Sequence, residues 1–231
     1  MSGAEGGADR GTRAVCGSVC LLAWTRIEKR SSPTDSSPRH RARRRQTGRS
    51  APLLLLALCL SSCVKPMPLP ILGSVPAFQL TAQSGQPFDG KSLAGRVWVA
   101  DFIYTTCPGP CPMMSSQMNR LQASTADTPD VKLVSFTVDP EHDTPPVLAE
   151  YGKHFKAEPA RWFFLTGNRA LLNDLGLNAF HLNSVDGSLV HSTRFTLVDR
   201  QGRIRGYYSS DQDGFMPKLL HDIRQLEGEK S

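Results

Sequence analysis

The feature that most constrains the fold is an apolar run that ends in two closely spaced cysteines. Residues 97–104 are mostly apolar and rich in β-branched and aromatic side chains, which predicts a buried strand. Residues 113–122 contain no helix breaker and carry apolar side chains at helical spacing, which predicts a helix. Cys107 and Cys111 therefore lie at a strand-to-helix turn, where their Cα atoms can come within disulfide range.

This turn also sets the chemistry expected of the two thiols. Pro112 suits the first turn of a helix, so we expect Cys111 near the positive end of the helix dipole, where its thiolate is favoured. Thiolates bind soft metals and attack disulfides. The spacing alone is equally consistent with a structural disulfide or with two small apolar core residues. Cys107 and Cys111 are thus candidates for a metal site, a redox-active pair or a structural bridge.

Charge is distributed unevenly along the chain. The 231 residues carry a net charge of +6, but residues 1–62 hold 11 Lys and Arg against 4 Asp and Glu. Residues 63–231 hold 16 against 17 and are close to neutral. Because no basic stripe remains after residue 62, the sequence gives no support for nucleic-acid binding.

The first 62 residues resemble processing segments rather than a domain. Residues 1–37 are rich in Gly, Ser and Arg without periodicity, and we predict that they are disordered or follow a wrongly assigned start. Residues 38–62 combine an arginine-rich stretch with an apolar run too short to span a bilayer, the pattern of a signal peptide. Leu60-Ser61-Ser62-Cys63 resembles the lipobox of bacterial lipoproteins, in which the cysteine is acylated. An uncleaved signal anchor and an ordinary signal peptide are the alternatives.

Removal of residues 1–62 would leave three of the six cysteines. Cys63 would carry lipid, so that Cys107 and Cys111 form the single remaining pair. We therefore predict a membrane-anchored lipoprotein of the bacterial cell envelope that faces the periplasm or the cell exterior. A lone thiol pair oxidises by default outside the cytoplasm, so metal binding requires that the pair be kept reduced.

The rest of the chain predicts a tether and one α/β domain. Residues 63–75 hold three prolines and are predicted to be the tether, and residues 76–231 the domain. The pattern predicts a hairpin at 78–80 and 86–88, followed by a strand at 97–104, a helix at 113–122, a strand at 131–138, a helix at 146–155, a strand at 162–165, a helix at 169–175, strands at 193–198 and 204–208, and a helix at 215–226. This alternation indicates an α/β sandwich in which helices flank a mixed central sheet.

Three segments resemble, in order, the signatures of the Sco (SenC) family of copper-binding proteins. The first is the cysteine motif at 105–112, and the second is the strand and Asp-Pro…Asp-Thr-Pro loop at 134–145. The third is Val190-His191-Ser192-Thr193, followed by the turn at 199–203. The resemblance implies a thioredoxin-like fold and one copper ion held by Cys107, Cys111 and His191.

Two thiolates and one imidazole suit Cu(I), with room for a further ligand on Cu(II), whereas zinc usually takes a fourth protein ligand. The resemblance implies a metallochaperone that helps to assemble the binuclear copper centre of cytochrome c oxidase, by delivering copper to the copper-receiving subunit, by reducing its cysteines, or both. Copper delivery alone is not enzymatic turnover. The alternative is a thiol–disulfide oxidoreductase without an essential metal, in which Cys107 and Cys111 exchange disulfides.

The chain departs from the family pattern in two places. Pro108-Gly109-Pro110 stands where an acidic residue is usual, and Val190 stands where an Asp often precedes the histidine. Asp139 and Asp143 either take part of that role or shape their loop, which also contains His142. The methionines that follow the second cysteine are either helix core or thioether contacts for copper: Met113, Met114 and Met118.

Overall fold

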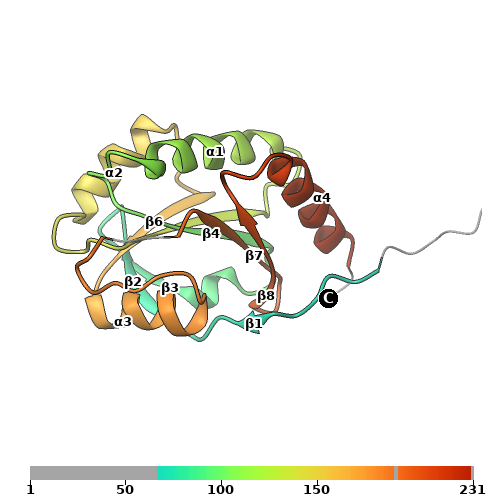
Figure 1. Cartoon of the computed structure of the whole chain (residues 1–231), viewed down its shortest axis with the longest axis horizontal. Helices are drawn as coiled ribbons and strands as arrows, with labels where there is room; N and C mark the ends of the chain where they lie inside the picture. The colour runs from blue at the N-terminus through green and yellow to red at the C-terminus, as the bar shows by residue number, and fades with distance from the viewer. Residues whose placement is uncertain (1–66, 190–191, 230–231) are drawn as a thin grey trace, which may run out of the picture. The chain divides into compact units, whose positions relative to one another are not determined.

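An eight-stranded mixed sheet forms the centre of the structure, a computed structural model that describes residues 67–189 and 192–229 (Figure 1). Its strands lie in the order β1-β8-β7-β4-β5-β6-β2-β3. Their bounds are β1 Gly73–Ser74, β2 Gln79–Ala82, β3 Pro87–Asp89, β4 Trp98–Ile103, β5 Lys132–Thr137, β6 Trp162–Thr166, β7 Arg194–Val198 and β8 Arg203–Ser209.

The middle of the sheet is parallel and its flanks are antiparallel. Strand β4 pairs in parallel with β5, and β5 in parallel with β6. On its other side β4 pairs antiparallel with β7, with Trp98 opposite Val198 and Ala100 opposite Thr196. Because these two strands run in opposite directions, the chain enters β7 at the end of the sheet where it leaves β4.

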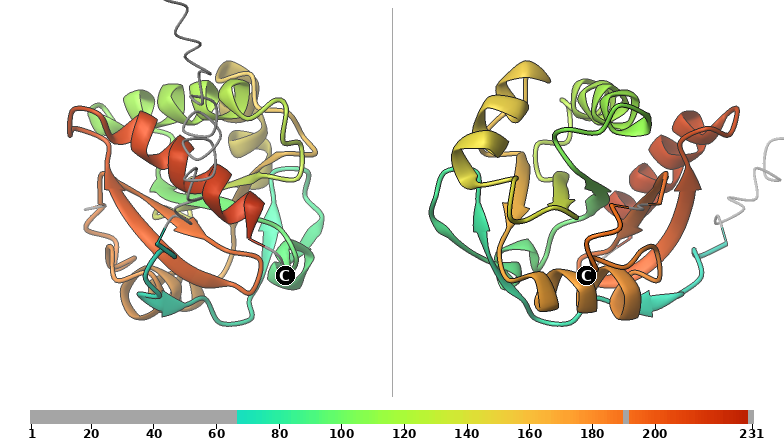
Figure 2. Two further views of the ribbon diagram at one scale, coloured as in Figure 1. Left: turned by 90° about the vertical axis from the view of Figure 1, so that its right-hand side faces the viewer. Right: turned by 60° about the vertical axis from the view of Figure 1, so that its left-hand side comes forward.

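Helices cover both faces of the sheet (Figures 1 and 2). On one face lie α1 Pro110–Ser124, α2 Pro145–His154 and α4 Phe215–Gly228. The other face carries α3 Arg169–Asn173 and the π-helical turn η2 Asp174–Ala179, and the 3₁₀ turn η1 Gly90–Leu93 follows β3. Each face has its own apolar cluster, because successive side chains of β4 alternate: Phe102 packs on the α3 side and Ile103 on the α1 side.

This arrangement confirms the predicted α/β sandwich, including the N-terminal hairpin of β2 and β3. The sequence did not predict β1, which lies within the segment assigned to the tether and pairs with β8. Residues 1–62 and Cys63 lie outside the described residues, so the predicted signal peptide and lipid attachment stay predictions. Within the described part of the chain, no helix combines the length and apolar character needed to cross a membrane.

Candidate metal centre

The two cysteines lie on the turn that joins β4 to α1. Helix α1 begins at Pro110, three residues earlier than the sequence predicted, with Gly109 at its N-terminal boundary. Prolines are tolerated in this first turn because the N–H groups there have no partner within the helix. Cys107 therefore lies in the turn itself, and Cys111 lies within the first turn of α1.

Both cysteines are thiols at this turn, and no disulfide bond joins them. Cys107 is 7% exposed and Cys111 is completely buried. The backbone N–H of Tyr104 donates to Cys111 Sγ at 3.5 Å, and that of Gly109 donates to Cys107 Sγ at 3.4 Å. The Cys107 side chain also lies within hydrogen-bonding reach of Cys111. The two sulfur atoms are therefore close enough to meet one small ligand.

The expectation that the Cys111 thiolate is favoured was wrong for the metal-free chain. Burial raises the pKa of Cys111 well above its ordinary value, because the charged thiolate loses its hydration. The hydrogen bond from the Tyr104 N–H lowers this pKa, whereas the neighbouring Cys107 and the buried Asp101 raise it. Cys111 is thus a protonated thiol at neutral pH until a cation or a reaction partner replaces the proton.

Tyr104 lies beside the thiol pair and contacts both cysteines. A hydrogen bond with the Cys107 side chain and burial both raise the pKa of the Tyr104 phenol. The sequence predicted only a buried strand over residues 97–104, of which Tyr104 is the last residue. The described site therefore contains a phenol beside the more exposed thiol.

The second motif is fastened to the cysteine turn by a buried carboxylate. Asp143 accepts hydrogen bonds from the backbone N–H of Thr105 at 3.2 Å and from its hydroxyl at 2.5 Å. The Thr137 hydroxyl donates to the same carboxylate at 2.6 Å. His142 Nδ1 lies 3.2 Å from Asp143 Oδ1, and about half of its side chain is exposed. Asp143 thus shapes the turn, and His142 lies beside it.

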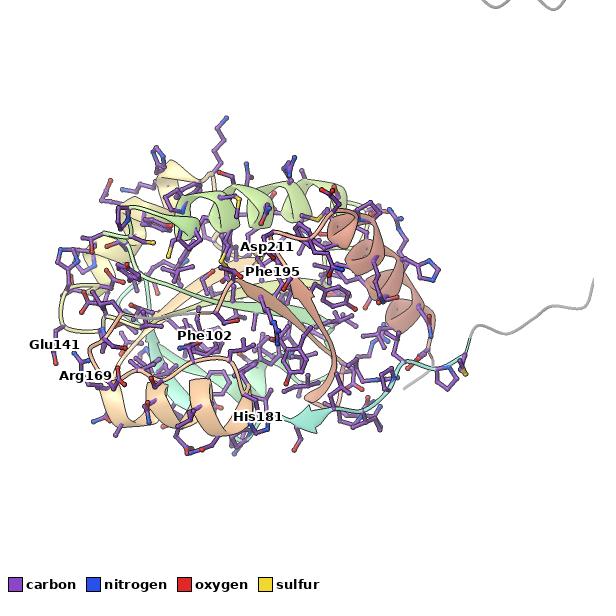
Figure 3. The ribbon with its side chains drawn as sticks, viewed as in Figure 1. Phe102, Glu141, Arg169, His181, Phe195 and Asp211 are labelled. Carbon is purple, nitrogen blue, oxygen red and sulfur yellow. The ribbon has the colours of Figure 1, made fainter. Side chains whose placement is uncertain are left out.

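The same loop is also joined to the opposite face of the sheet. Arg169 at the start of α3 forms an ion pair with Glu141, with Nη2 and Oε2 2.7 Å apart. Figure 3 shows these two side chains meeting at one end of the molecule. The loop that carries His142 is therefore fixed to the cysteine turn through Asp143 and to α3 through Glu141.

The third motif is described only in part. Val190 and His191 lie outside the described residues, whereas Ser192 and Thr193 lead into β7. The N–H of Ser210 donates to the Thr193 carbonyl at 2.8 Å, and Gln117 Nε2 donates to the Ser210 carbonyl at 3.0 Å. Because Gln117 is on α1, the helix that carries Cys111 is linked to the segment that follows His191.

Sequence reasoning missed Gln117, although a signal was present. It shares a helical face with Met114, Met118 and Leu121 at the spacing typical of a buried stripe, and it is 7% exposed. A polar residue at a core position requires a hydrogen-bond partner, which here is the Ser210 carbonyl.

The methionines mostly serve as core. Met114 and Met118 are completely buried in the cluster that contains both cysteines, whereas Met113 is 44% exposed. Among residues 67–189 and 192–229, no group of three His, Cys, Asp or Glu side chains could hold a metal ion. A third His, Cys, Asp or Glu ligand for a metal bound by Cys107 and Cys111 would therefore have to come from outside the described residues.

An α/β sandwich with a reduced thiol pair at the turn after its first central strand defines a thioredoxin-like thiol protein. The family model SCO1/SenC matches residues 73–226. The chain belongs to the SCO1/SenC family, as the three motifs predicted.

Individual proteins of this family align over most of their length. The SCO1 protein homolog of Bacillus subtilis (strain 168) is 30% identical over 183 residues, which cover 77% of this chain and 94% of that protein. The solved structure of BsSco, a member of the Sco family of cytochrome c oxidase assembly proteins with a disulfide switch, is 28% identical, with a TM-score of 0.63 over 71% of this chain and 100% of its own. Copper-bound ScoI of Bradyrhizobium japonicum is 27% identical, with a TM-score of 0.53 over 67% of this chain and 99% of its own.

Proposed function

We propose that this chain binds one copper ion through Cys107, Cys111 and His191 and helps to assemble the binuclear copper centre of cytochrome c oxidase. The observation that carries the proposal is the pair of buried, reduced thiols at the turn between β4 and α1. Copper-bound ScoI and the assembly role of BsSco's family support the metal and the process.

The donor set fits Cu(I). Thiolates are soft ligands, and two of them at a buried turn suit a soft cation of low coordination number. The Cys107 and Cys111 side chains are within hydrogen-bonding reach of each other, so one ion can contact both sulfur atoms. Copper binding would displace the thiol protons. The positive charge of the ion would stabilise the Cys111 thiolate and so oppose the effect of burial, which raises the pKa of Cys111.

His191 is the proposed third ligand. It stands two residues before Thr193, and the chain enters β7 beside the end of β4 from which the cysteine turn continues. The hydrogen bonds that join Gln117 to Ser210 and Ser210 to Thr193 support the proposal. They hold the segment that leads into β7 against α1, the helix that carries Cys111. The neutral imidazole nitrogen completes a three-ligand set for Cu(I).

Membrane attachment is part of the proposal. Acylation of Cys63 would keep the domain at the membrane that holds the copper-receiving subunit of the oxidase. The apolar run at 51–60 and the Leu60-Ser61-Ser62-Cys63 motif support this location in the cell envelope.

Reduction of the recipient is a second candidate function. It is favoured by the different exposure of the thiols, since Cys107 is partly exposed and Cys111 is not, and by the disulfide switch of BsSco. The Cys107 thiolate would attack the recipient disulfide, and Cys111 would resolve the mixed disulfide. Two electrons and two protons pass to the recipient, which leaves a Cys107–Cys111 disulfide in this chain.

Mixing the copper-loaded protein with the soluble copper-binding domain of the oxidase separates the two functions. Mass spectrometry reports both copper content and thiol state of the recipient. Transfer of copper to a recipient that is already reduced supports the metallochaperone function. Reduction of an oxidised recipient by the metal-free protein, with no copper transfer from the loaded one, would replace it with the oxidoreductase function.

A further inference from the structure

The segment that leads into the domain presents apolar side chains to solvent. Met67 is 86% exposed, Ile71 60% and Leu72 46%. Among the described residues only two other large hydrophobic side chains are exposed, Met113 and Leu177. These three side chains lie within six residues, 67–72, which we name the N-terminal edge, and such a concentration of exposed apolar side chains marks an interaction site.

The N-terminal edge is held firmly by the domain. The N–H of Leu72 donates to the Ile204 carbonyl at 2.8 Å, and β1 then pairs with β8. Gln225 Nε2 donates to the Met67 carbonyl at 2.8 Å. The Arg205 side chain, itself 4% exposed, donates to the Leu69 carbonyl at 2.8 Å. The exposed side chains therefore project from a fixed segment and not from a loose linker.

The backbone of this segment has few polar groups left to satisfy. Pro66, Pro68 and Pro70 carry no N–H donor. Arg205 donates to the Pro70 carbonyl at 3.2 Å in addition to that of Leu69. Moving the N-terminal edge out of water therefore leaves few backbone groups without a partner, which lowers the cost of its burial.

Chain position and charge indicate a lipid surface as the partner. Met67 lies four residues after Cys63, the proposed acylation site, so the two are at most about 14 Å apart. No acidic residue occurs between Asp35 and Asp89, so this stretch itself contains no carboxylate that an anionic head group would repel. Asp199 and Glu229, which adjoin the segment through Arg205, are both ion-paired with that arginine.

We infer that the N-terminal edge rests on the membrane surface, with Met67, Ile71 and Leu72 among the lipid head groups. The inference rests on the proposed anchoring through Cys63. Figure 3 shows Glu141, in the loop of His142, at the opposite end of the view from the segment that precedes β1. The contact thus orients the domain so that the loop beside the thiol pair points away from the bilayer. A lipid anchor alone would leave the domain free to tumble.

Tryptophan substitution tests this contact in the full chain isolated from the membranes of an expressing bacterium. Ile71→Trp places a probe on the N-terminal edge, and Met113→Trp places a matched exposed probe on α1. Vesicles of phosphatidylethanolamine and phosphatidylglycerol that contain brominated acyl chains quench a tryptophan on contact. Of the three native tryptophans, Trp98 and Trp162 are buried, and Trp24 lies in the leader that we predict is removed, so the wild-type protein supplies the background. Mass spectrometry records whether Cys63 is acylated, and copper content is measured on the same samples.

The inference predicts strong quenching and a blue shift at position 71 and neither at position 113. A Met67→Ser/Ile71→Ser/Leu72→Ser variant with Cys63→Ser should bind vesicles at least about tenfold more weakly than Cys63→Ser alone, with unchanged copper content. Equal quenching at the two positions, or unchanged vesicle binding by the serine variant, would overturn the inference. Concentration-dependent dimers that the serine variant abolishes would instead assign the N-terminal edge to a second copy. Loss of copper in the wild-type protein would count against the proposed function and not against the membrane contact.

Discussion

Asp143 is completely buried and accepts two hydrogen bonds from Thr105, one from its backbone N–H and one from its hydroxyl. Thr105 stands two residues before Cys107 in the cysteine turn, whereas Asp143 belongs to the loop after β5. This contact joins the first two motifs. The shape of the thiol site therefore depends on a carboxylate that need not touch the metal.

Replacement of Asp143 should damage both stability and metal binding. Asp143→Ala leaves the Thr105 and Thr137 groups without their acceptor, and we expect a loss of about 2–3 kcal/mol in the free energy of unfolding. The copper affinity of the folded fraction should also fall, because the cysteine turn loses its support. Urea unfolding and competition with a Cu(I) chelator measure the two effects. Asp127→Ala, at an exposed position, is the control, and equal copper affinity in both variants would contradict this role.

Two buried glutamines of α1 give a matched test of the link to the third motif. Gln117→Leu removes the hydrogen bond to the Ser210 carbonyl, and Gln122→Leu removes bonds to Lys156 and Glu158. Each should cost about 1–2 kcal/mol of stability. Chelator competition should show a copper affinity about tenfold lower for Gln117→Leu only, since of these two glutamines only Gln117 is linked through Ser210 to Thr193, two residues after the proposed ligand His191. Equal affinities of the two variants would show that the link does not position a ligand.

The two thiols should differ in their reactivity toward an alkylating reagent. Cys107 is 7% exposed, whereas Cys111 is completely buried and burial raises its pKa. Because the thiolate is the reactive form, iodoacetamide at neutral pH should modify Cys107 well before Cys111 in the folded, reduced, metal-free protein. Peptide mass spectrometry over a time course measures the order in which the two cysteines are modified. Faster modification of Cys111 would contradict the described burial, and denatured protein, in which both should react alike, is the control.

Acid should loosen the region that holds the N-terminal segment. Burial raises the pKa of Asp199, but hydrogen bonds from the Arg203 backbone and from the Arg205 and Arg203 side chains outweigh it and lower this pKa below its ordinary value of 3.8. A depressed pKa in the folded state contributes stability that is full above the unfolded pKa and is lost as pH falls through the folded pKa. Urea unfolding should therefore show a decline below about pH 4 that is smaller in Asp199→Asn. Parallel pH profiles of the two proteins would contradict this contribution.

Much of the fold was predictable because its elements carry strong local patterns. The apolar run at 97–104 became β4, and the turn residues between 198 and 204 became the β7–β8 hairpin. Strand β1 was not predictable, because Gly73 and Ser74 have no strand preference and pair with β8 only through long-range contacts. Helix α1 begins earlier than expected because Pro110 also fits a first helical turn.

The thiol pair of the candidate site was predictable, and the residues that support it were not. Cys107 and Cys111 stand out by their spacing, and the family resemblance alone pointed to His191, which lies outside the described residues. The pKa of Cys111 was mispredicted because the helix dipole was visible in the sequence and complete burial was not. Asp143 and Gln117 act through contacts between elements distant in sequence, which no local pattern encodes.

Copper binding by the reduced protein tests the central claim most directly. Wild type, His191→Ala and Cys107→Ala/Cys111→Ala are compared by chelator competition, with His221→Ala as a control histidine on α4. The proposed three-ligand site predicts one tightly bound copper ion in wild type and in His221→Ala. It predicts markedly weakened binding in His191→Ala and loss of binding in the double cysteine variant. Wild-type affinity in His191→Ala, or a reduced wild-type protein that binds no copper while it exchanges disulfides, would contradict it.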